Sequence, residues 1–195
     1  MVLIVIEHLE ECVFPWLYFE YKNAVRLIGR SNLLFTNVCR EDDIKVLKSI
    51  AQVTCKSSTE LFKEPIVLDP QAKEMLSPED AKKSTVAIVG GILGDHPPRG
   101  RTKTMLTSKF ENAIVRSLGP KQLSIDGAAY TAHVVLNHGI PLKEIKFIDG
   151  ITIRRKIGGI VHEIHLPYRY PVLNNKPIVS IELLEHLKRG LNVNV

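Results

Sequence analysis

Short apolar runs alternate with longer stretches of mixed polarity along the chain. Four runs rich in β-branched residues predict strands at residues 2–7, 32–38, 65–69 and 85–91. Several of them are apolar at successive positions instead of at every second one, which is typical of strands covered on both faces in a parallel sheet. The pattern therefore predicts an α/β fold in which a mostly parallel sheet is flanked by helices.

The remaining stretches have helical spacing or extended character. We expect helices at residues 15–28, 41–50, 105–118, 126–138 and 180–189. The third of these would stop at Gly119-Pro120, and the fourth would be capped by Asp126 and end at Gly139. Residues 145–172 predict an antiparallel hairpin with Gly158-Gly159 as its turn.

Composition limits the class of protein. With 195 residues, of which 45% are hydrophobic and 24% charged, the chain fits one compact domain spanning residues 1–195. The formal net charge of +5 is a mild indication of an anionic partner such as RNA or a ribonucleoprotein. The first apolar run ends at Glu7, which makes it too short for a signal peptide or a membrane span.

The cysteines and histidines carry little pattern. Cys12, Cys39 and Cys55 contain no CxxC pair, and the seven histidines are scattered without helical HxxxH pairing. We therefore expect neither a disulfide framework nor a metal site. This cysteine usage indicates a reducing, cytoplasmic location.

Residues 85–102, TVAIVGGILGDHPPRGRT, run from a predicted strand into glycines and a proline-stiffened loop. Ligands of parallel sheets bind beyond the carboxyl ends of the strands. Gly90, Gly91 and Gly94 would let backbone groups approach a small molecule, or would allow a strand to pack tightly against a helix. A dinucleotide-binding fingerprint is disfavoured, because Val89 stands where a glycine is needed and Pro97-Pro98 follow.

Six motifs together point to a family: GGILGDHPPRGRT, EHLEE, IVLDP, LSIDGA, KFID and LPYRYPV. They resemble the small family of predicted RNA methyltransferases of the SPOUT class, whose fungal member methylates an arginine of a small-subunit ribosomal protein. The likeness spans nearly the whole chain. It implies an α/β fold with a deep trefoil knot and a molecule of S-adenosylmethionine held bent among the knot loops, with S-adenosylhomocysteine as the product.

The resemblance also implies which loops form the cofactor pocket. Taken alone, residues 68–70 read as a strand-ending turn, Asp126 as a helix cap and Tyr168 as a core residue. On the resemblance, Gly91 faces the cofactor, so that Gly91→Val would remove binding without unfolding the protein. The expected cofactor-binding residues are Leu68, Asp69, Pro70, Gly90, Gly91, Ile92, Leu93, Gly94, Leu123, Ser124, Ile125, Asp126, Gly127, Leu166, Pro167 and Tyr168.

The acceptor decides which charges the site needs. A guanidinium calls for carboxylates that hold its planar fork, whereas RNA calls for Arg or Lys along the phosphates. The chain offers both, an acidic pocket of Glu7, Glu10, Glu11 and Asp95 and a basic rim of Arg99, Arg101, Lys103 and residues 154–156. We expect catalysis on an arginine of a ribosomal protein by Asp95, Arg99, Arg101, Glu7 and Glu10.

Three other functions stay open on the sequence. One is a methyltransferase that modifies RNA, and another is a catalytically silent module that binds RNA or the ribosome. The third, a nicotinamide-dependent oxidoreductase, is disfavoured by the missing fingerprint glycine. In each case the chain is expected to work as a monomer or a homodimer, without a membrane or a metal.

Overall fold

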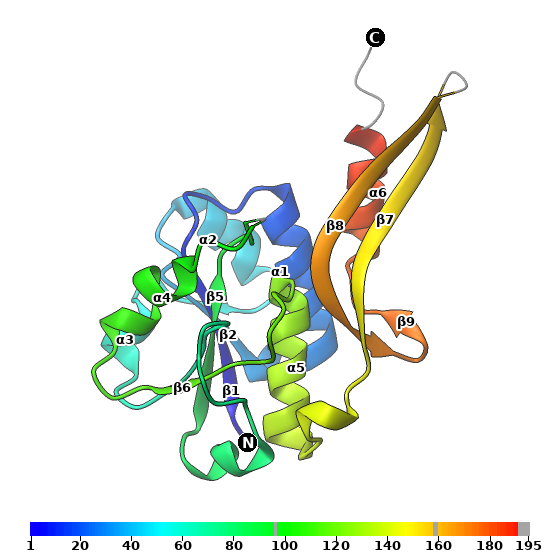
Figure 1. Ribbon diagram of the computed structural model, residues 1–195. Coiled ribbons are helices and arrows are strands. Elements are labelled where there is room, and N and C mark those ends of the chain that lie inside the picture. The colour runs from blue at the N-terminus through cyan, green and yellow to red at the C-terminus, as the bar shows by residue number, and fades with distance from the viewer. Residues whose placement is uncertain (96, 158–159, 191–195) are drawn as a thin grey trace.

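The computed structural model describes residues 1–95, 97–157 and 160–190, and its centre is a sheet of six parallel strands. The strands occur in the spatial order β3 (Gln52–Val53), β2 (Leu33–Thr36), β1 (Leu3–His8), β5 (Val86–Gly91), β4 (Ile66–Leu68) and β6 (Ile114–Arg116). Figure 1 shows β1 and β5 side by side in the middle of this sheet. Because every strand runs the same way, all carboxyl ends lie along one edge.

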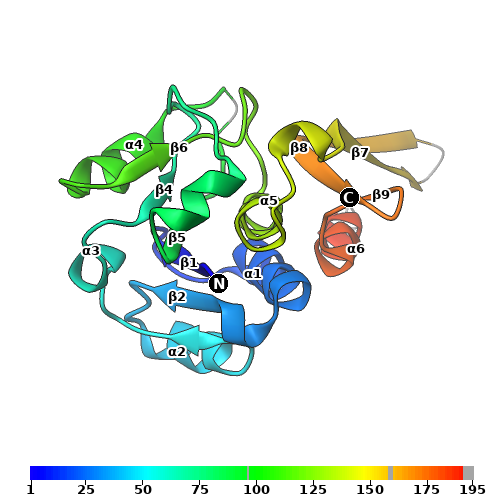
Figure 2. The same ribbon diagram turned by 90° about the horizontal axis from the view of Figure 1, so that it is seen from below.

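Helices cover both faces of the sheet (Figure 2). The first core cluster receives side chains from α1 (Pro15–Ile28), α2 (Glu41–Lys48) and α5 (Ile125–His138). The opposite cluster lies beside α3 (Ser58–Leu61) and α4 (Arg101–Met105). Short 3-10 segments lie in the connections, at Arg30–Asn32, Pro78–Lys82, Thr107–Lys109 and Leu142–Glu144.

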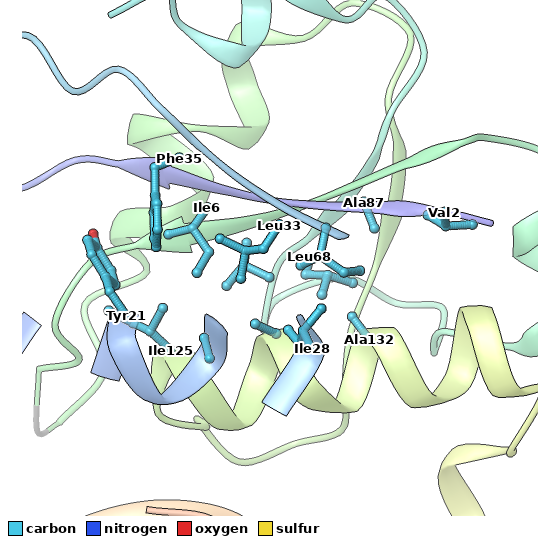
Figure 3. Close-up of a cluster of buried hydrophobic side chains, with 14 of the residues drawn as sticks. Val2, Ile6, Tyr21, Ile28, Leu33, Phe35, Leu68, Ala87, Ile125 and Ala132 are labelled. Carbon is cyan, nitrogen blue, oxygen red and sulfur yellow. The ribbon is translucent and has the colours of Figure 1, made fainter. Parts of the chain in front are cut away.

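The central strands bury side chains on both faces. Ile4 and Ile6 enter the first cluster, whereas Val5 between them enters the second. Figure 3 shows how Ile6 and Phe35 meet Tyr21 in the first cluster. This double burial explains the continuous apolar runs of the strands and confirms the predicted helix-flanked, mostly parallel sheet.

The C-terminal part of the chain forms a separate antiparallel sheet. Its strands are β7 (Phe147–Ile157), β8 (Ile160–Leu173) and β9 (Lys176–Pro177), and α6 (Ile181–Gly190) packs beside the hairpin of β7 and β8. Figure 1 shows this hairpin and α6 extending away from the parallel sheet; we refer to residues 146–190 as the arm. A third core cluster joins the arm to Trp16 of α1. The predicted hairpin is therefore confirmed, although its expected turn at Gly158-Gly159 lies outside the described residues.

The predicted helix at 105–118 is wrong. Helix α4 ends at Met105, and after a 3-10 turn the chain forms strand β6, which pairs with β4 through Ile66 and Ile114. The apolar residues that gave this stretch its helical spacing contact both faces of the sheet, since Leu106 lies in the second cluster and Ile114 packs against the first. Pairing with β4 at the edge of the sheet has overridden a weak helical pattern.

The observed cap of α5 lies two residues before the predicted one. Ser124 is the N-cap, and its hydroxyl accepts a hydrogen bond from the backbone N–H of Gly127 (3.3 Å). Asp126 lies in the first turn, where it accepts from the same N–H (2.8 Å). Gly139 ends the helix in a left-handed conformation, as predicted.

The expectation of no disulfide is also wrong. Cys39 and Cys55 form a disulfide that joins the loop after β2 to the loop after β3, while Cys12 is free. The two cysteines are separated by 16 residues in sequence. No local motif marks such a pair, because parallel β2 and β3 bring the two loops together only in the folded chain.

Candidate functional site

A cleft opens beyond the carboxyl ends of β4, β5 and β6. Small-molecule sites generally combine apolar walls with a few polar groups. This cleft has the same character, because most of its wall is apolar and its polar groups come from few side chains. It is lined by Leu68, Asp69, Pro70, Val89, Gly90, Ile92, Thr102, Leu118, Gly119, Lys121, Gln122, Leu123, Ile125 and Ala128.

The cleft brings together part of the residue set expected to bind a cofactor. Three separate loops contribute, and the expected residues that line the cleft are Leu68, Asp69, Pro70, Gly90, Ile92, Leu123 and Ile125. The segment 118–122 was missed, although it supplies a large share of the wall. The helix stop predicted at Gly119-Pro120 instead lies within the loop that follows β6.

The two glycines at the end of β5 face opposite directions. A Cβ on Gly90 would make ordinary contacts with Ile92 (3.4 Å) and Thr102 (3.8 Å), both of which line the cleft. A Cβ on Gly91 would collide with the hydroxyl of Tyr21 and lie 2.8 Å from the carbonyl oxygen of Glu7. The expectation that Gly91 faces the cofactor is therefore corrected: Gly91 faces α1, and Gly90 faces the cleft.

Leu166, Pro167 and Tyr168 do not line the cleft. The Tyr168 hydroxyl donates a hydrogen bond to the carbonyl oxygen of Gly94 (2.8 Å), and burial raises the pKa of this tyrosine to about 12. Leu166 is buried in the third core cluster. Strand β8 also pairs with the cleft wall, since the backbone N–H of Arg169 donates to the carbonyl oxygen of Gln122 (2.8 Å). The hairpin thus holds the loop after β5 through Gly94 and the loop after β6 through Gln122.

Ser124, Asp126 and Gly127 are buried at the start of α5 and do not line the cleft either. Asp126 accepts a hydrogen bond from the side-chain amide of Asn23 (2.6 Å). A Cβ on Gly127 would lie 3.1 Å from the ring of Pro171. These residues fix the first turn of the helix whose Ile125 does reach the cleft.

A buried carboxyl group that the sequence analysis did not single out lies beside that turn. Glu20 accepts hydrogen bonds from the indole N–H of Trp16 (2.7 Å) and from the backbone N–H of Ile125 (2.9 Å). Burial, with a smaller contribution from the charge of Asp126, raises the pKa of Glu20 to about 8, and burial raises the pKa of Asp126 as well. Two buried carboxyl groups therefore lie beside the helix turn that reaches the cleft, and their simultaneous ionisation is unfavourable.

A second cleft adjoins the first. The two share Asp69, Pro70, Thr102 and Gln122, and the second is further lined by Gln71, Pro98, Arg99, Gly100, Arg101 and Pro120. The carboxylate of Asp69 is fixed between the backbone N–H of Gln71 (2.8 Å) and the hydroxyl of Thr107 (2.7 Å). Arg99 is exposed at this cleft.

The acidic residues do not form the single pocket that the sequence predicts. Glu7 is buried, and its carboxylate accepts hydrogen bonds from the hydroxyls of Thr36 and Ser57 and from the backbone N–H of Ser58. It is thereby occupied within the fold. Glu11 is exposed on the loop after β1.

Glu10 and Asp95 do converge, and they meet on an arginine of the chain itself. Arg101 Nη1 lies 3.2 Å from Glu10 Oε1, and Arg101 Nε lies 2.9 Å from Asp95 Oδ2. The backbone N–H of Leu93 donates to the same Oε1 of Glu10 (2.9 Å). This contact ties the loop after β1 to the loop after β5.

The expected basic rim is divided between two places. Arg99, Arg101 and Lys103 lie near the second cleft or on α4, whereas residues 154–156 lie on strand β7 of the arm. Arg154 pairs with Glu163 across the hairpin (2.6 Å), and Arg155 donates to the backbone carbonyl of Lys188 in α6 (2.8 Å). The basic run therefore belongs to the arm and not to the cleft.

Two further findings apply to the described part of the chain. It contains no group of three or more His, Cys, Asp or Glu side chains arranged to hold a metal ion. None of its helices combines the length and the hydrophobicity needed to cross a membrane.

Comparisons with known proteins give a consistent family. The family model described as protein arginine N-methyltransferase SFM1-like matches residues 3–194. Protein arginine N-methyltransferase SFM1 of Saccharomyces cerevisiae is 35% identical over 202 residues, which covers 95% of this chain and 93% of that protein. The crystal structure of yeast SFM1 complexed with SAM has a TM-score of 0.85 at 33% identity, over 97% of this chain and 91% of that chain. The dual-specific Trm10 of Thermococcus kodakaraensis, at 16% identity, shares the fold with a TM-score of 0.60, over 74% of this chain and 96% of its own.

Proposed function

The chain belongs to the SFM1-like family of protein arginine N-methyltransferases, and we propose that it transfers a methyl group from S-adenosylmethionine to an arginine side chain of a protein. The observation that supports this most directly is the cleft beyond β4, β5 and β6. It lies at the sheet edge where parallel folds bind ligands. The deep trefoil knot that the resemblance implies stays part of this prediction.

The residues of the cleft fit S-adenosylmethionine. Its apolar side chains, among them Leu118, Leu123 and Ala128, offer a surface for a purine ring, and Gly90 leaves open the space that a side chain would take. Asp69, Lys121 and Gln122 supply the polar groups for the ribose and the amino-acid end. When bound, this cofactor supplies an activated methyl group, which an arginine nitrogen takes up by in-line displacement with loss of one proton.

The acceptor needs orientation and a group that takes the proton. We assign both tasks to the carboxylates of Glu10 and Asp95, because their side chains are 20% and 29% exposed and are joined to the loop that lines the cleft. Glu7 is not assigned to this step, since donors within the fold already engage its carboxylate. The protein segment that carries the arginine would lie along the second cleft, where Arg99 and Asp69 present one charge of each sign.

The arm suggests what surrounds the acceptor. Residues 146–190 contain eight Lys and Arg against four Asp and Glu, so they carry a net charge of +4 out of the +5 of the whole chain. Such a charge favours contact with phosphates. A ribosomal protein that is already near RNA would suit both the carboxylates of Glu10 and Asp95 and the basic arm. A cytoplasmic location goes with such a substrate, whereas the disulfide between Cys39 and Cys55 contradicts the argument for that location from cysteine usage.

One labelling experiment tests the acceptor. The protein is incubated with S-adenosylmethionine labelled in its methyl group and with ribosomes from cells that lack the protein, and the label is followed after protease or nuclease treatment. We expect label in protein, on methylarginine after hydrolysis. Label that nuclease alone removes would show that RNA is the acceptor, and no label together with no cofactor binding in calorimetry would favour a catalytically silent module.

A further inference from the structure

Arg101 is the first residue of α4 and precedes Thr102, which lines both clefts. Its guanidinium contacts three acceptors from two loops: Asp95 through Nε, Glu10 through Nη1, and the backbone carbonyl of Leu93 through Nη2. Leu93 in turn donates its N–H to Glu10. A closed ring of contacts therefore joins Glu10, Leu93 and Arg101, and Asp95 is attached to it.

This ring uses only one oxygen of each carboxylate. Oε1 of Glu10 and Oδ2 of Asp95 take all the contacts just described. Within residues 1–95, 97–157 and 160–190, Oε2 of Glu10 and Oδ1 of Asp95 have no hydrogen-bond partner. Both side chains are partly exposed, so these oxygens remain available to a ligand.

We propose that Arg101 is a positioning residue that holds Glu10 and Asp95 as a two-oxygen fork for the guanidinium of the acceptor. This inference rests on the proposed function and names the group that gives it specificity for arginine. The planar guanidinium of Arg101 fixes the orientation of each carboxylate through its inner oxygen. The outer oxygens then face a second guanidinium from fixed positions.

The charges of the cluster agree with this role. Two carboxylates and one guanidinium leave a net charge of −1, which attracts a cation, and Arg101 reduces the repulsion between the two acids. A guanidinium has donors in a rigid fork that can reach two separate oxygens, whereas a lysine ammonium is a compact point charge. The arrangement therefore favours arginine over lysine as the acceptor.

The test measures binding of N-acetyl-arginine amide and N-acetyl-lysine amide to the full chain saturated with S-adenosylhomocysteine, so that no turnover occurs. Wild type should bind the arginine probe more tightly than the lysine probe. In Arg101→Gln the affinity for the arginine probe should fall about 10- to 100-fold, as expected for loss of a charge-assisted contact network. Arg101→Lys restores the charge without the planar fork and should recover only part of this loss.

A matched control keeps a general loss of structure apart from this effect. Arg116 also lies between two carboxylates, at 2.9 Å from Asp80 and 2.8 Å from Glu74, and takes no part in the proposed fork. Arg116→Gln should lower the unfolding temperature and leave the affinity for the arginine probe unchanged. In methyl-transfer assays, Arg101→Gln should raise the KM for the protein acceptor more than it lowers kcat.

Three outcomes would overturn the inference. Tighter binding of the arginine probe by Arg101→Gln would show that Arg101 occupies the acceptor position and blocks it. Unchanged binding would make Arg101 a surface residue, and an equal loss of S-adenosylhomocysteine affinity would limit its role to holding the cofactor wall. Each leaves the proposed function standing, whereas failure of wild type to bind S-adenosylhomocysteine at all would refute that function itself.

Discussion

The hydroxyl of Tyr168 on β8 donates a hydrogen bond to the carbonyl oxygen of Gly94 (2.8 Å), and it thereby joins the arm to the loop after β5. We expect Tyr168→Phe to leave the fold intact and to reduce the free energy of unfolding by about 1 kcal/mol, because one hydrogen bond is lost. The loop that carries Ile92 should loosen, so the affinity for S-adenosylmethionine should fall severalfold in calorimetry.

Tyr170→Phe is the control for this change. Tyr170 is also buried in the third cluster, and its hydroxyl has no hydrogen-bond partner in the part of the chain that the structure describes. Loss of its hydroxyl should leave cofactor affinity unchanged. Equal losses in the two variants would mean that the bond between Tyr168 and Gly94 does not support the cleft.

The glycine pair at the end of β5 gives a second prediction. Gly90→Val places its Cβ in ordinary contact with Ile92 and Thr102, and its methyl groups would extend into the cleft. We expect a folded protein that has lost S-adenosylmethionine binding. Gly91→Val should instead lower the unfolding temperature sharply, because its Cβ would collide with Tyr21 and the backbone of Glu7. Circular dichroism melting and calorimetry would separate the two, and a stable Gly91→Val without cofactor binding would contradict the structure.

Glu7 and Glu10 should respond differently to the same substitution. In Glu7→Gln an amide NH₂ replaces an oxygen that accepts hydrogen bonds in a buried site, which should cost about 1–3 kcal/mol of unfolding free energy. The KM for the protein acceptor should not change. Glu10→Gln should change stability little, raise that KM and lower kcat, because an amide neither pairs with a guanidinium nor takes up its proton. Urea unfolding and steady-state kinetics on both variants test this, and a raised acceptor KM in Glu7→Gln would return Glu7 to the acceptor site.

The sequence was sufficient for the elements whose pattern is set by burial. Continuous apolar runs marked β1, β2, β4 and β5, since each is covered on both faces. Strand β6 has three residues and lies at the edge of the sheet. Three residues are too few to show the alternation of a strand, and the apolar residues around them have helical spacing, so the pattern predicts a helix. Short edge strands are defined by their pairing more than by their own residues.

The site was harder to predict for a different reason. Gly90 and Gly91 are adjacent, and adjacent residues of a strand point to opposite faces of the sheet. Which glycine faces the ligand therefore depends on which face of the sheet the ligand occupies, and the sequence does not reveal that face. Glu10 and Arg101 are 91 positions apart. Their contact arises because β1 and β5 are neighbours in the sheet, which no local pattern encodes.

The disulfide between Cys39 and Cys55 leads to a prediction about redox conditions. A bond that closes a loop of this length stabilises a protein by up to about 3 kcal/mol, mainly by restricting the unfolded chain. Addition of dithiothreitol should lower the midpoint of urea unfolding. Cys39→Ser should unfold at the reduced midpoint and show no response to the reductant. If wild type did not respond either, the two thiols would not be joined in solution.

The buried carboxyl groups Glu20 and Asp126 predict how stability depends on pH. The pKa of Glu20 is raised from an ordinary value of 4.5 to about 8, mainly by burial, so the folded protein holds a proton that the unfolded chain releases. For a raised carboxyl pKa the contribution to stability is complete below pH 4.5 and is lost as pH rises toward about 8. This pair should therefore make the free energy of unfolding decrease across that window.

Urea unfolding at several pH values measures the slope, and Glu20→Gln, which has no proton to lose, should flatten it. Glu11→Gln, which changes an exposed carboxylate, should keep the wild-type slope. If Glu20→Gln kept the wild-type slope as well, the proton would not be held at this pair.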